Sequence, residues 1–549
     1  MADKQTPGPE MAIPGLTHIK QVRHNFTTGA LYEEIVTHRE GKIAHLGPVV
    51  IRTGHDAEMP PSDKFIVKDP VSDKKVYWDS VKNELSENFF NTLYNRLLAY
   101  MQSKTAYVQD CMAGSVEEYG VPMRIITETA WHSLFARNMF YQLSDPLPLE
   151  QFAPAFTLIH VPGFHAIPEL DGTSTASFVI ISLERKLVLI GGTSYAGEIK
   201  QAVFTMVNYL MPEDVFVMRC SANVGPDGDV AIFMGRGEAG KTTLAIDPSR
   251  RFLGDHSHAW NEKGLFNLDW GGYAKLYGIR EENQPYIFAC TRKFGTLLEN
   301  VSIDPDTRRI DTNDNSLTEN IRAAYPISHL PNAIRRGLFG HPKNLFLLTC
   351  DAFGVLPPIA RLTPEQAVYA FLSAYTAKFK QTETGKMTPE IMFDVCFGDA
   401  ALALPSHAYG RKLMEKITEH KIKCWLVNTG WSGEPYTRGE RIKIGHSRAL
   451  IRAAISGDFN TVRWETDPVF QFEVPAQSPD ENIPAEMLNP RKQAADPGEY
   501  EMRANRLVAE FVKDFKKFES DIPEDMRVML SQVISVDDSF DFEEYDFNI

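Results

Sequence analysis

The stretch that decides the fold runs Val230-Ala-Ile-Phe-Met-Gly-Arg-Gly-Glu-Ala-Gly-Lys-Thr242. Its first five residues are apolar and predict a buried strand, and the rest satisfies the spacing G-x-x-x-x-G-K-[ST]. In such a loop the backbone N–H groups turn inward around phosphate oxygens, Lys241 reaches the β- and γ-phosphates, and Thr242 offers a hydroxyl to Mg²⁺. The preceding strand and the helix-compatible run that follows favour nucleotide binding over a purely structural glycine loop.

The residues around this loop extend the prediction. The expected nucleotide-binding residues are Gly235, Gly237, Glu238, Ala239, Gly240, Lys241, Thr242 and Thr243. Downstream, Arg251-Phe-Leu-Gly-Asp255 is an apolar strand that ends in a carboxylate, which is where a second Mg²⁺ ligand belongs. The alternative, in which Asp255 caps a helix or a turn, would be preferred if the loop were absent.

Farther out, apolar periodicity predicts further strands and two long helices. Short apolar runs bounded by turn residues predict strands at 156–161, 178–183, 187–190, 345–348 and 425–427. Helical spacing predicts a helix over 86–101, which Ser86 would cap, and an amphipathic helix over 503–519. Alternating strands and helices are typical of an α/β protein.

Composition and charge limit the class of function. The 549 residues include 57 Lys and Arg against 72 Asp and Glu, a net charge of −15, which argues against a general nucleic-acid binder. No apolar run is long enough to cross a membrane, and the start of the chain does not resemble a secretory signal. The six cysteines are irregularly spaced without a C-x-x-C pair, which predicts buried thiols rather than disulfides or zinc. We therefore expect a cytoplasmic protein.

The two ends of the chain differ from the rest. Residues 1–15 are polar and rich in Pro and Gly, and we expect a flexible lead-in. Residues 536–549 alternate acidic and aromatic side chains. This acidic-aromatic tail is either a solvated end or a docking or autoinhibitory segment, through which a protein partner could bind.

Several further motifs stand in order along the chain. They are Leu189-Ile-Gly-Gly-Thr193 with Tyr195 and Gly197-Glu-Ile-Lys200, Cys220-Ser-Ala-Asn-Val-Gly225, Gly254-Asp255, Glu319-Asn-Ile-Arg322, Asp351-Ala-Phe-Gly-Val-Leu-Pro-Pro358, Thr376-Ala-Lys378 and Val427-Asn-Thr-Gly-Trp431. With these motifs and the phosphate loop, the chain resembles ATP-dependent phosphoenolpyruvate carboxykinase over nearly its whole length.

The resemblance implies an α/β fold of two domains with the active site in the cleft between them. We expect an N-terminal domain at 16–220 and a C-terminal P-loop domain, which binds ATP, at 221–535, fewer domains than the three to four that length alone suggests. The implied reaction decarboxylates oxaloacetate and passes the γ-phosphate of ATP to the resulting enolate, as in gluconeogenesis. It uses Mg²⁺ on the nucleotide and a second cation, usually Mn²⁺, between the γ-phosphate and the substrate.

On the nucleotide side the family pattern is kept. Positions that match phosphate, Mg²⁺, nucleotide or reacting-centre residues of the family are Lys241, Thr242, Asp255, Arg441, Lys200 and Arg322, while Ser447 stands where threonine is usual near the base. Tyr195 matches on the substrate side, and the segment 376–385 matches the family's lid.

At the second cation the family pattern is broken. The family holds that cation with a lysine, a histidine and an aspartate, and the matching positions here are Gln201, Arg219 and His256. An arginine has a fixed positive charge and no lone pair, so it cannot ligate a metal ion. Met59 stands where the family has an arginine that binds oxaloacetate. These substitutions argue against Mn²⁺ at the second site and against the family reaction in its usual form.

Three hypotheses follow from this pattern. In the first, the chain is the family enzyme, and His256 and Gln201 hold Mn²⁺ weakly. In the second, it is an ATP-dependent kinase for another acceptor, in which Arg219 replaces the second metal at the γ-phosphate. In the third, it binds ATP as a catalytically silent regulator. Alternatively, Arg219 only forms a salt bridge with Glu238 or Asp255.

Overall fold

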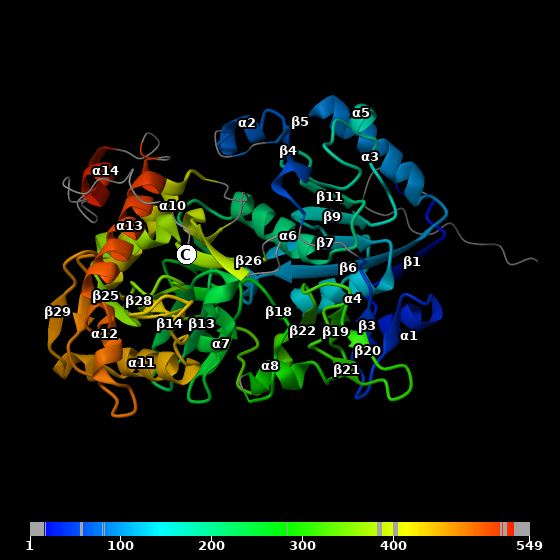
Figure 1. Cartoon of the computed structure of the whole chain (residues 1–549). Coiled ribbons are helices and arrows are strands. Elements are labelled where there is room, and N and C mark those ends of the chain that lie inside the picture. Colours follow the sequence, from blue (N-terminus) through cyan, green and yellow to red (C-terminus); the bar gives the residue numbers. More distant parts are fainter. Residues whose placement is uncertain are drawn as a thin grey trace, which may run out of the picture.

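The computed structural model describes residues 16, 18–54, 59–78, 81, 83–282, 284–381, 387–398, 404–516, 519 and 524–531. Two large sheets dominate it, one built from the first 191 residues and one from residues 221–475. In Figure 1 the first sheet lies on the right, in blue and cyan, and the second on the left, in green to orange. The predicted α/β class is confirmed.

The N-terminal sheet has nine strands in the described part of the chain, in the order β1-β6-β7-β9-β11-β10-β4-β5, with β8 paired to β6. The strands are β1 (Gln21–His24), β4 (Lys64–Lys68), β5 (Glu84–Ser86), β6 (Thr105–Ala113), β7 (Val121–Thr127), β8 (Tyr141–Gln142), β9 (Phe156–Val161), β10 (Phe178–Ser182) and β11 (Leu187–Gly191). The helices in this part are α1 (Thr28–Thr37), α2 (Ser72–Lys75), α3 (Glu87–Met101), α4 (Ala130–Met139), α5 (Pro168–Asp171) and α6 (Gly197–Leu210).

The C-terminal sheet has eight strands in the order β15-β13-β14-β24-β28-β25-β30-β29. They are β13 (Ser221–Val224), β14 (Val230–Met234), β15 (Arg251–Gly254), β24 (Pro342–Thr349), β25 (Ile359–Leu362), β28 (Lys423–Asn428), β29 (Trp464–Thr466) and β30 (Glu473–Pro475). Its helices are α7 (Lys241–Ala245), α9 (Pro364–Ser373), α10 (Ser406–His420), α11 (Ile444–Ser456), α12 (Pro490–Gln493), α13 (Pro497–Phe515) and α14 (Glu524–Ser531).

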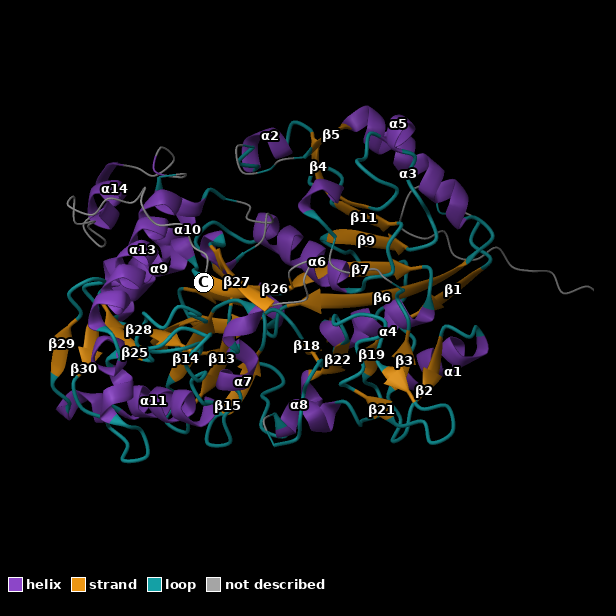
Figure 2. Ribbon diagram, viewed as in Figure 1, coloured by secondary structure: helices purple, strands orange, loops and turns teal. Residues whose placement is uncertain are grey.

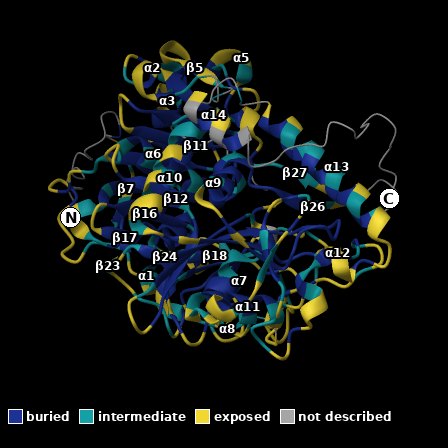
Figure 3. Cartoon of the chain, turned by 90° about the vertical axis from the view of Figure 1, so that its left-hand side faces the viewer, coloured by how far each residue is buried: buried dark blue, intermediate teal, exposed yellow. Residues whose placement is uncertain are grey.

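The central strand β14 shows why the apolar run of the sequence folds as it does. All five of its side chains are buried, and β14 pairs in parallel with β24 and antiparallel with β13. Ile232 and Met234 face one hydrophobic core, while Ala231 and Phe233 face the core on the other side of the sheet. Figure 3 shows this burial along the strands, with exposed residues mainly on outer helices and loops.

Two smaller sheets join chain segments from both sides of residue 220. The first has the order β18-β22-β19-β3-β2 and contains β2 (Gly41–Ile43), β3 (Val49–Ile51), β18 (Gly271–Lys275), β19 (Leu297–Glu299) and β22 (Arg322–Pro326). The second has the order β12-β16-β17-β23 and contains β12 (Phe216–Arg219), β16 (Ser257–Asn261), β17 (Gly264–Asn267) and β23 (Leu338–Phe339). Figure 2 shows the helix α8 (Pro285–Cys290) near the first of them. The predicted domain boundary at 220 stays a prediction.

Two hairpins complete the described strands. They pair β20 (Ser302–Ile303) with β21 (Ile310–Asp311), and β26 (Thr376–Gln381) with β27 (Met387–Met392). The second hairpin holds the start of the predicted lid, whose residues 382–385 lie outside the described residues. None of the described helices combines the length and the apolar character that crossing a membrane requires.

The predicted elements agree with the structure except at some ends. Ser86 caps α3 as expected, since its side chain accepts a hydrogen bond from the N–H of Phe89. Phe89 is one of the apolar residues whose helical spacing predicts this helix, yet it is 42% exposed. The helix α13 begins at Pro497, six residues before the predicted start, because Asp496 caps it. All six cysteines are buried and unbridged; their apolar surroundings in the sequence predict burial for most of them. The predicted flexible lead-in and the acidic-aromatic tail lie outside the described residues.

Candidate active site

The phosphate loop connects β14 to α7. The turn Gly237–Ala239 precedes Gly240, whose φ of +78° lies in the left-handed region that favours glycine. Gly235 packs so closely on β24 that a Cβ there would lie 2.8 Å from the Cβ of Leu348. The ammonium of Lys241 folds back to the carbonyl oxygen of Gly235. The glycine-rich turn and the lysine thus lie together at the end of β14.

A cavity of about 410 Å³ opens in front of this loop. Of the predicted site residues, it is lined by Tyr195, Lys200, Gln201, Arg219, Gly235, Gly237, Gly240, Lys241, Thr242, Thr243, Asp255, His256 and Arg322. Among the site residues whose side chains the structure describes, Met59, Ala239, Arg441 and Ser447 do not line it. Residues from α6, β12, β18 and β22 thus share one cavity with the phosphate loop.

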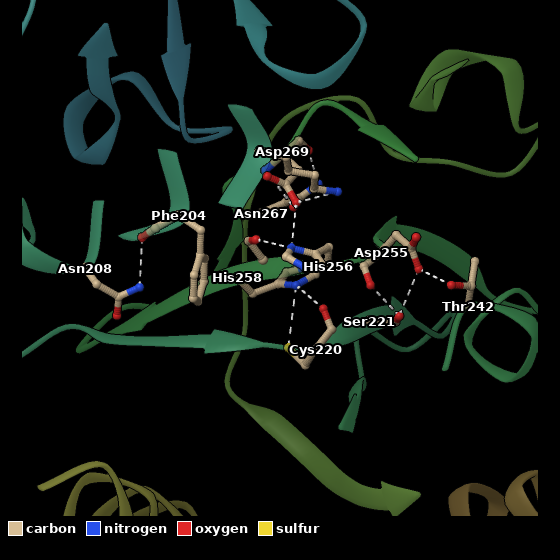
Figure 4. Close-up of polar contacts among 12 residues, drawn as sticks. Phe204, Asn208, Cys220, Ser221, Thr242, Asp255, His256, His258, Asn267 and Asp269 are labelled. Atoms are coloured by element: carbon tan, nitrogen blue, oxygen red, sulfur yellow. Dashed lines mark hydrogen bonds and ion pairs between the residues drawn. The ribbon is translucent and has the colours of Figure 1, made fainter. Parts of the chain in front are cut away.

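Thr242 and Asp255 meet at the edge of this cavity. The hydroxyl of Thr242 donates a hydrogen bond to the Asp255 carboxylate, which also accepts one from Ser221 at 3.2 Å (Figure 4). A hydroxyl and a carboxylate beside a phosphate loop are the oxygen ligands that Mg²⁺ prefers, with phosphate oxygens and waters completing its octahedron. These two residues fit the Mg²⁺ of a bound nucleotide.

A buried ion pair lies deeper in the cleft. Lys200 and Asp269 are 4% and 5% exposed, and the Lys200 ammonium lies 3.3 Å from the Asp269 carboxylate. Burial alone would raise the pKa of Asp269, but Lys200 and His256 lower it to about 2. The His256 ring lies 3.6 Å from the same carboxylate (Figure 4), and burial and the Lys200 charge lower its pKa. At neutral pH the group therefore holds one cation, one anion and a neutral imidazole.

Arg219 packs among the same residues. It ends β12 opposite Ser257, the residue after His256. Its guanidinium lies 5.0 Å from the ring centroid of Phe204, which in turn meets the edge of the His256 ring. The guanidinium is thus placed among the second-cation positions.

These residues do not fit a second divalent cation. A divalent ion about 4 Å from a guanidinium would meet a repulsion of about 8 kcal/mol at an effective dielectric constant of about 20. Arg219 supplies no lone pair, and none of the three positions supplies a carboxylate. Within the described ranges, no group of three or more His, Cys, Asp and Glu side chains is arranged to hold a metal ion.

Arg322 lies beside two aromatic rings, those of Tyr195 and Tyr273. Its guanidinium carbon is 4.8 Å from the ring centroid of Tyr273 and 5.7 Å from that of Tyr195, and its Nε donates to Asn320. The Tyr273 hydroxyl lies 2.9 and 3.0 Å from the two carboxylate oxygens of Glu299, which is 1% exposed. The two tilted rings and this buried carboxylate surround the Arg322 charge on one side.

Met59 is bound to α6 through its main chain. Its N–H donates to the Glu198 carboxylate at 2.9 Å, and its side chain is buried. Lys64 lies 3.1 Å from Glu198 and donates to the side-chain oxygen of Gln201 at 2.7 Å. The surroundings of Met59 therefore contain a salt bridge, and its own side chain is a thioether.

Arg441 and Ser447 stand behind the loop. Arg441 Nε donates to the carbonyl oxygen of Thr429, whose hydroxyl donates to the carbonyl oxygen of Ala239. Ser447 is buried in the first turns of α11, and the next residue, Arg448, donates to the carbonyl oxygen of Thr243. Both predicted residues thus contact the loop through neighbours.

Sequence patterns do not single out five residues in and around the site: Asp269, Tyr273, Glu299 and the ion pair of Arg236 with Asp394. Of these, Arg236, Tyr273 and Asp394 line the cavity. The only local signal for Asp269 is a carboxylate that closely follows the strand β17. Glu299 stands in an apolar strand, where a lone acid gives no local indication of its partner.

Comparison with known proteins gives a consistent relationship. The phosphoenolpyruvate carboxykinase family profile matches residues 20–484. A relative from Pelobacter propionicus named phosphoenolpyruvate carboxykinase (ATP) is 50% identical over 516 residues, which cover 94% of this chain and 97% of that protein. Proteins of the same name from Geobacter metallireducens and Thermus thermophilus are 48% and 44% identical; the matches cover 94% and 93% of this chain and 97% of each protein. The chain therefore belongs to the ATP-dependent phosphoenolpyruvate carboxykinase family.

Proposed function

We propose that this chain binds Mg·ATP in the cleft and transfers the γ-phosphoryl group to a small acceptor held beside Lys200 and Arg322. One observation supports this above the others: the phosphate loop lines the same cavity as Lys200, Arg219 and Arg322. A phosphate donor and a cluster of cations in one cavity are what phosphoryl transfer requires, because the reaction is catalysed mainly by positioning and charge.

On the nucleotide side, the loop N–H groups and Lys241 would bind the phosphates. Thr242 and Asp255 would hold Mg²⁺, which offsets phosphate charge when bound. Arg441 and Ser447 would contact the nucleoside end, and their links to the loop through Thr429 and Arg448 would position them.

Oxaloacetate is the first acceptor to test, because the relatives are named phosphoenolpyruvate carboxykinase (ATP). In that reaction the bond to the leaving carboxylate breaks, its electrons form the enolate, and the enolate oxygen attacks the γ-phosphorus to give phosphoenolpyruvate, ADP and CO₂. Lys200 and Arg322 would stabilise the charges that develop on the enolate and on the transferring phosphoryl group.

A second candidate, transfer to a different acceptor, is favoured by Met59. A buried thioether cannot offer the two parallel N–H donors with which arginine binds a carboxylate. An acceptor with one carboxylate fewer than oxaloacetate would not need the arginine that Met59 replaces.

The test is ³¹P NMR of the purified chain with Mg·ATP and oxaloacetate, followed by a panel of other keto and hydroxy acids. Phosphoenolpyruvate and ADP would support the family reaction, and ADP formed only with another acceptor would support the second candidate. Lys241→Ala should abolish either product, whereas Lys263→Ala, which removes a half-exposed surface lysine, should not. If ATP binds and no acceptor gives ADP, phosphoryl transfer is refuted and a silent ATP-binding regulator remains. The cytoplasmic location and a partner for residues 536–549 stay predictions.

A further inference from the structure

The three positions that correspond to the family's second cation are close together on α6, β12 and the segment before β16. Gln201 follows Lys200 on α6, Arg219 ends β12, and His256 precedes the strand that pairs with β12. All three line the cavity that the phosphate loop lines. The net charge of these three side chains would therefore interact electrostatically with the outer phosphates of a nucleotide bound in the loop.

The side-chain oxygen of Gln201 already accepts a hydrogen bond from a lysine of the protein. It accepts a hydrogen bond from the Lys64 ammonium at 2.7 Å, and Lys64 is held in turn by Glu198 at 3.1 Å. Asp269, a second buried carboxylate near these positions, is likewise paired with Lys200. The oxygens that could attract a metal ion thus already have cationic partners.

Arg219 has the position and the support of a fixed charge. The Phe204 ring, one turn after Lys200 on α6, lies under its guanidinium. A guanidinium held over a ring is pre-organised and stays charged at every physiological pH. It also presents N–H donors in a planar fork that matches phosphate oxygens.

We propose, building on the proposed function, that the Arg219 guanidinium replaces the family's second divalent cation, so that the cleft works with the single divalent ion that arrives with ATP. The formal charge supports the exchange. A divalent cation held by a neutral lysine, a neutral histidine and an aspartate carries one net positive charge. Glutamine, arginine and a neutral histidine carry the same charge without a metal ion.

The exchange has a consequence for ligand recognition. A metal ion bridges phosphate and acceptor through oxygen ligands, whereas a guanidinium donates hydrogen bonds to phosphate oxygens. Arg219 therefore recognises the γ-phosphate, and the chain distinguishes ATP from ADP through it. The acceptor needs no metal-chelating pair of oxygens.

The first experiment counts Mn²⁺ ions by electron paramagnetic resonance, since the spectrum of free Mn²⁺ disappears on binding. With a non-hydrolysable ATP analogue, the wild-type chain should bind one Mn²⁺, and without nucleotide it should bind none tightly. The triple variant Gln201→Lys, Arg219→His and His256→Asp rebuilds the family's ligand set, and should gain a site that needs no nucleotide. A second Mn²⁺ on the wild-type chain would overturn the proposal.

The second experiment needs only single variants and keeps the proposal testable if the triple variant does not fold. Arg219→Gln should weaken binding of Mg·ATP by about tenfold or more, which is roughly 1.4 kcal/mol or more, and binding of Mg·ADP by less than about twofold. Arg219→Lys should recover part of the loss. The matched control Arg251→Gln, an exposed arginine on β15, should change neither affinity.

Equal weakening of ATP and ADP, or no weakening, would overturn the assignment of Arg219 to the γ-phosphate. Failure of the proposed function gives a different result: the wild-type chain itself would then show no binding of Mg·ATP, whatever the effect of Arg219 variants. The Mn²⁺ count on the nucleotide-free wild-type chain still tests whether the second site exists.

Discussion

Replacement of Glu299 by glutamine should change how stability depends on pH. Glu299 ends β19 with its carboxylate 1% exposed, and both carboxylate oxygens contact the hydroxyl of Tyr273 at 2.9 and 3.0 Å. Burial raises the pKa of Glu299 from 4.5 to about 7, although the bond from Tyr273 and the charge of Arg322 act in the opposite direction. The folded chain therefore binds this proton more tightly than the unfolded chain.

The sign of the effect follows from that difference. The stability that Glu299 contributes is fully present below pH 4.5, falls as the pH rises, and is lost above the folded-state pKa of about 7. A shift of about 2.5 pKa units corresponds to roughly 3 kcal/mol of unfolding free energy over this range. Glutamine has nearly the same shape and no charge, so Glu299→Gln should remove this part of the slope.

The assay is urea unfolding followed by tryptophan fluorescence between about pH 5 and pH 8. The variant should lose less stability than the wild-type chain as the pH rises, with a difference of up to roughly 3 kcal/mol. Glu118→Gln, which changes an acid with 67% side-chain exposure, is the control and should leave the profile unchanged. If the unfolding free energies of the wild-type chain and of Glu299→Gln change with pH in parallel, the pKa of Glu299 is not raised in the folded chain.

Three further predictions concern the phosphate loop and the N-terminal sheet. Lys241→Ala should weaken Mg·ATP binding in calorimetry by about tenfold or more without changing the unfolding midpoint, and unchanged affinity would rule out the loop as the phosphate site. Gly240→Ala should lower the unfolding free energy by about 1–2 kcal/mol. The loss should come from backbone strain alone, because nothing lies within 4 Å of the added Cβ. An unchanged urea midpoint would contradict the left-handed backbone at Gly240. Arg124→Met should lower the unfolding free energy by roughly 3–5 kcal/mol, because it leaves the Asp110 carboxylate without its buried partner. Both side chains are fully buried and are joined by hydrogen bonds of 2.7 and 2.9 Å. A loss below about 1 kcal/mol would show that His24 alone balances the charge of Asp110.

Much of the fold is encoded in local patterns. The apolar run of β14 identifies a central strand because every residue faces one of two cores, and Ser86 marks the start of α3 because its hydroxyl caps the first turn. The helix α13 starts six residues earlier than its apolar stripe predicts, because the cap at Asp496 lies ahead of the residues on which that prediction depends. Strand order is not local, and no pattern in the sequence indicates that β3 pairs with β19.

The site divides in the same way. Thr242 and Lys241 follow from the spacing of one short motif, and their meeting with Asp255 follows from a strand that ends beside it. The partners that set the charge of the cleft are distant in sequence: Lys64 lies 137 residues from Gln201, and Arg236 lies 158 residues from Asp394. Such pairs depend on the packing of α6 and of β12 against the phosphate loop, which periodicity does not specify.

In the proposed mode of binding, the cleft takes Mg·ATP with one divalent cation and with Arg219 in the place of a second. The most direct test is a crystal structure of the chain with Mn²⁺ and a non-hydrolysable ATP analogue, with Mn²⁺ located by anomalous scattering. We expect one Mn²⁺ peak, beside Thr242 and Asp255, and the Arg219 guanidinium within hydrogen-bonding distance of the γ-phosphate. Two Mn²⁺ peaks, with the second among Gln201, Arg219 and His256, would contradict it.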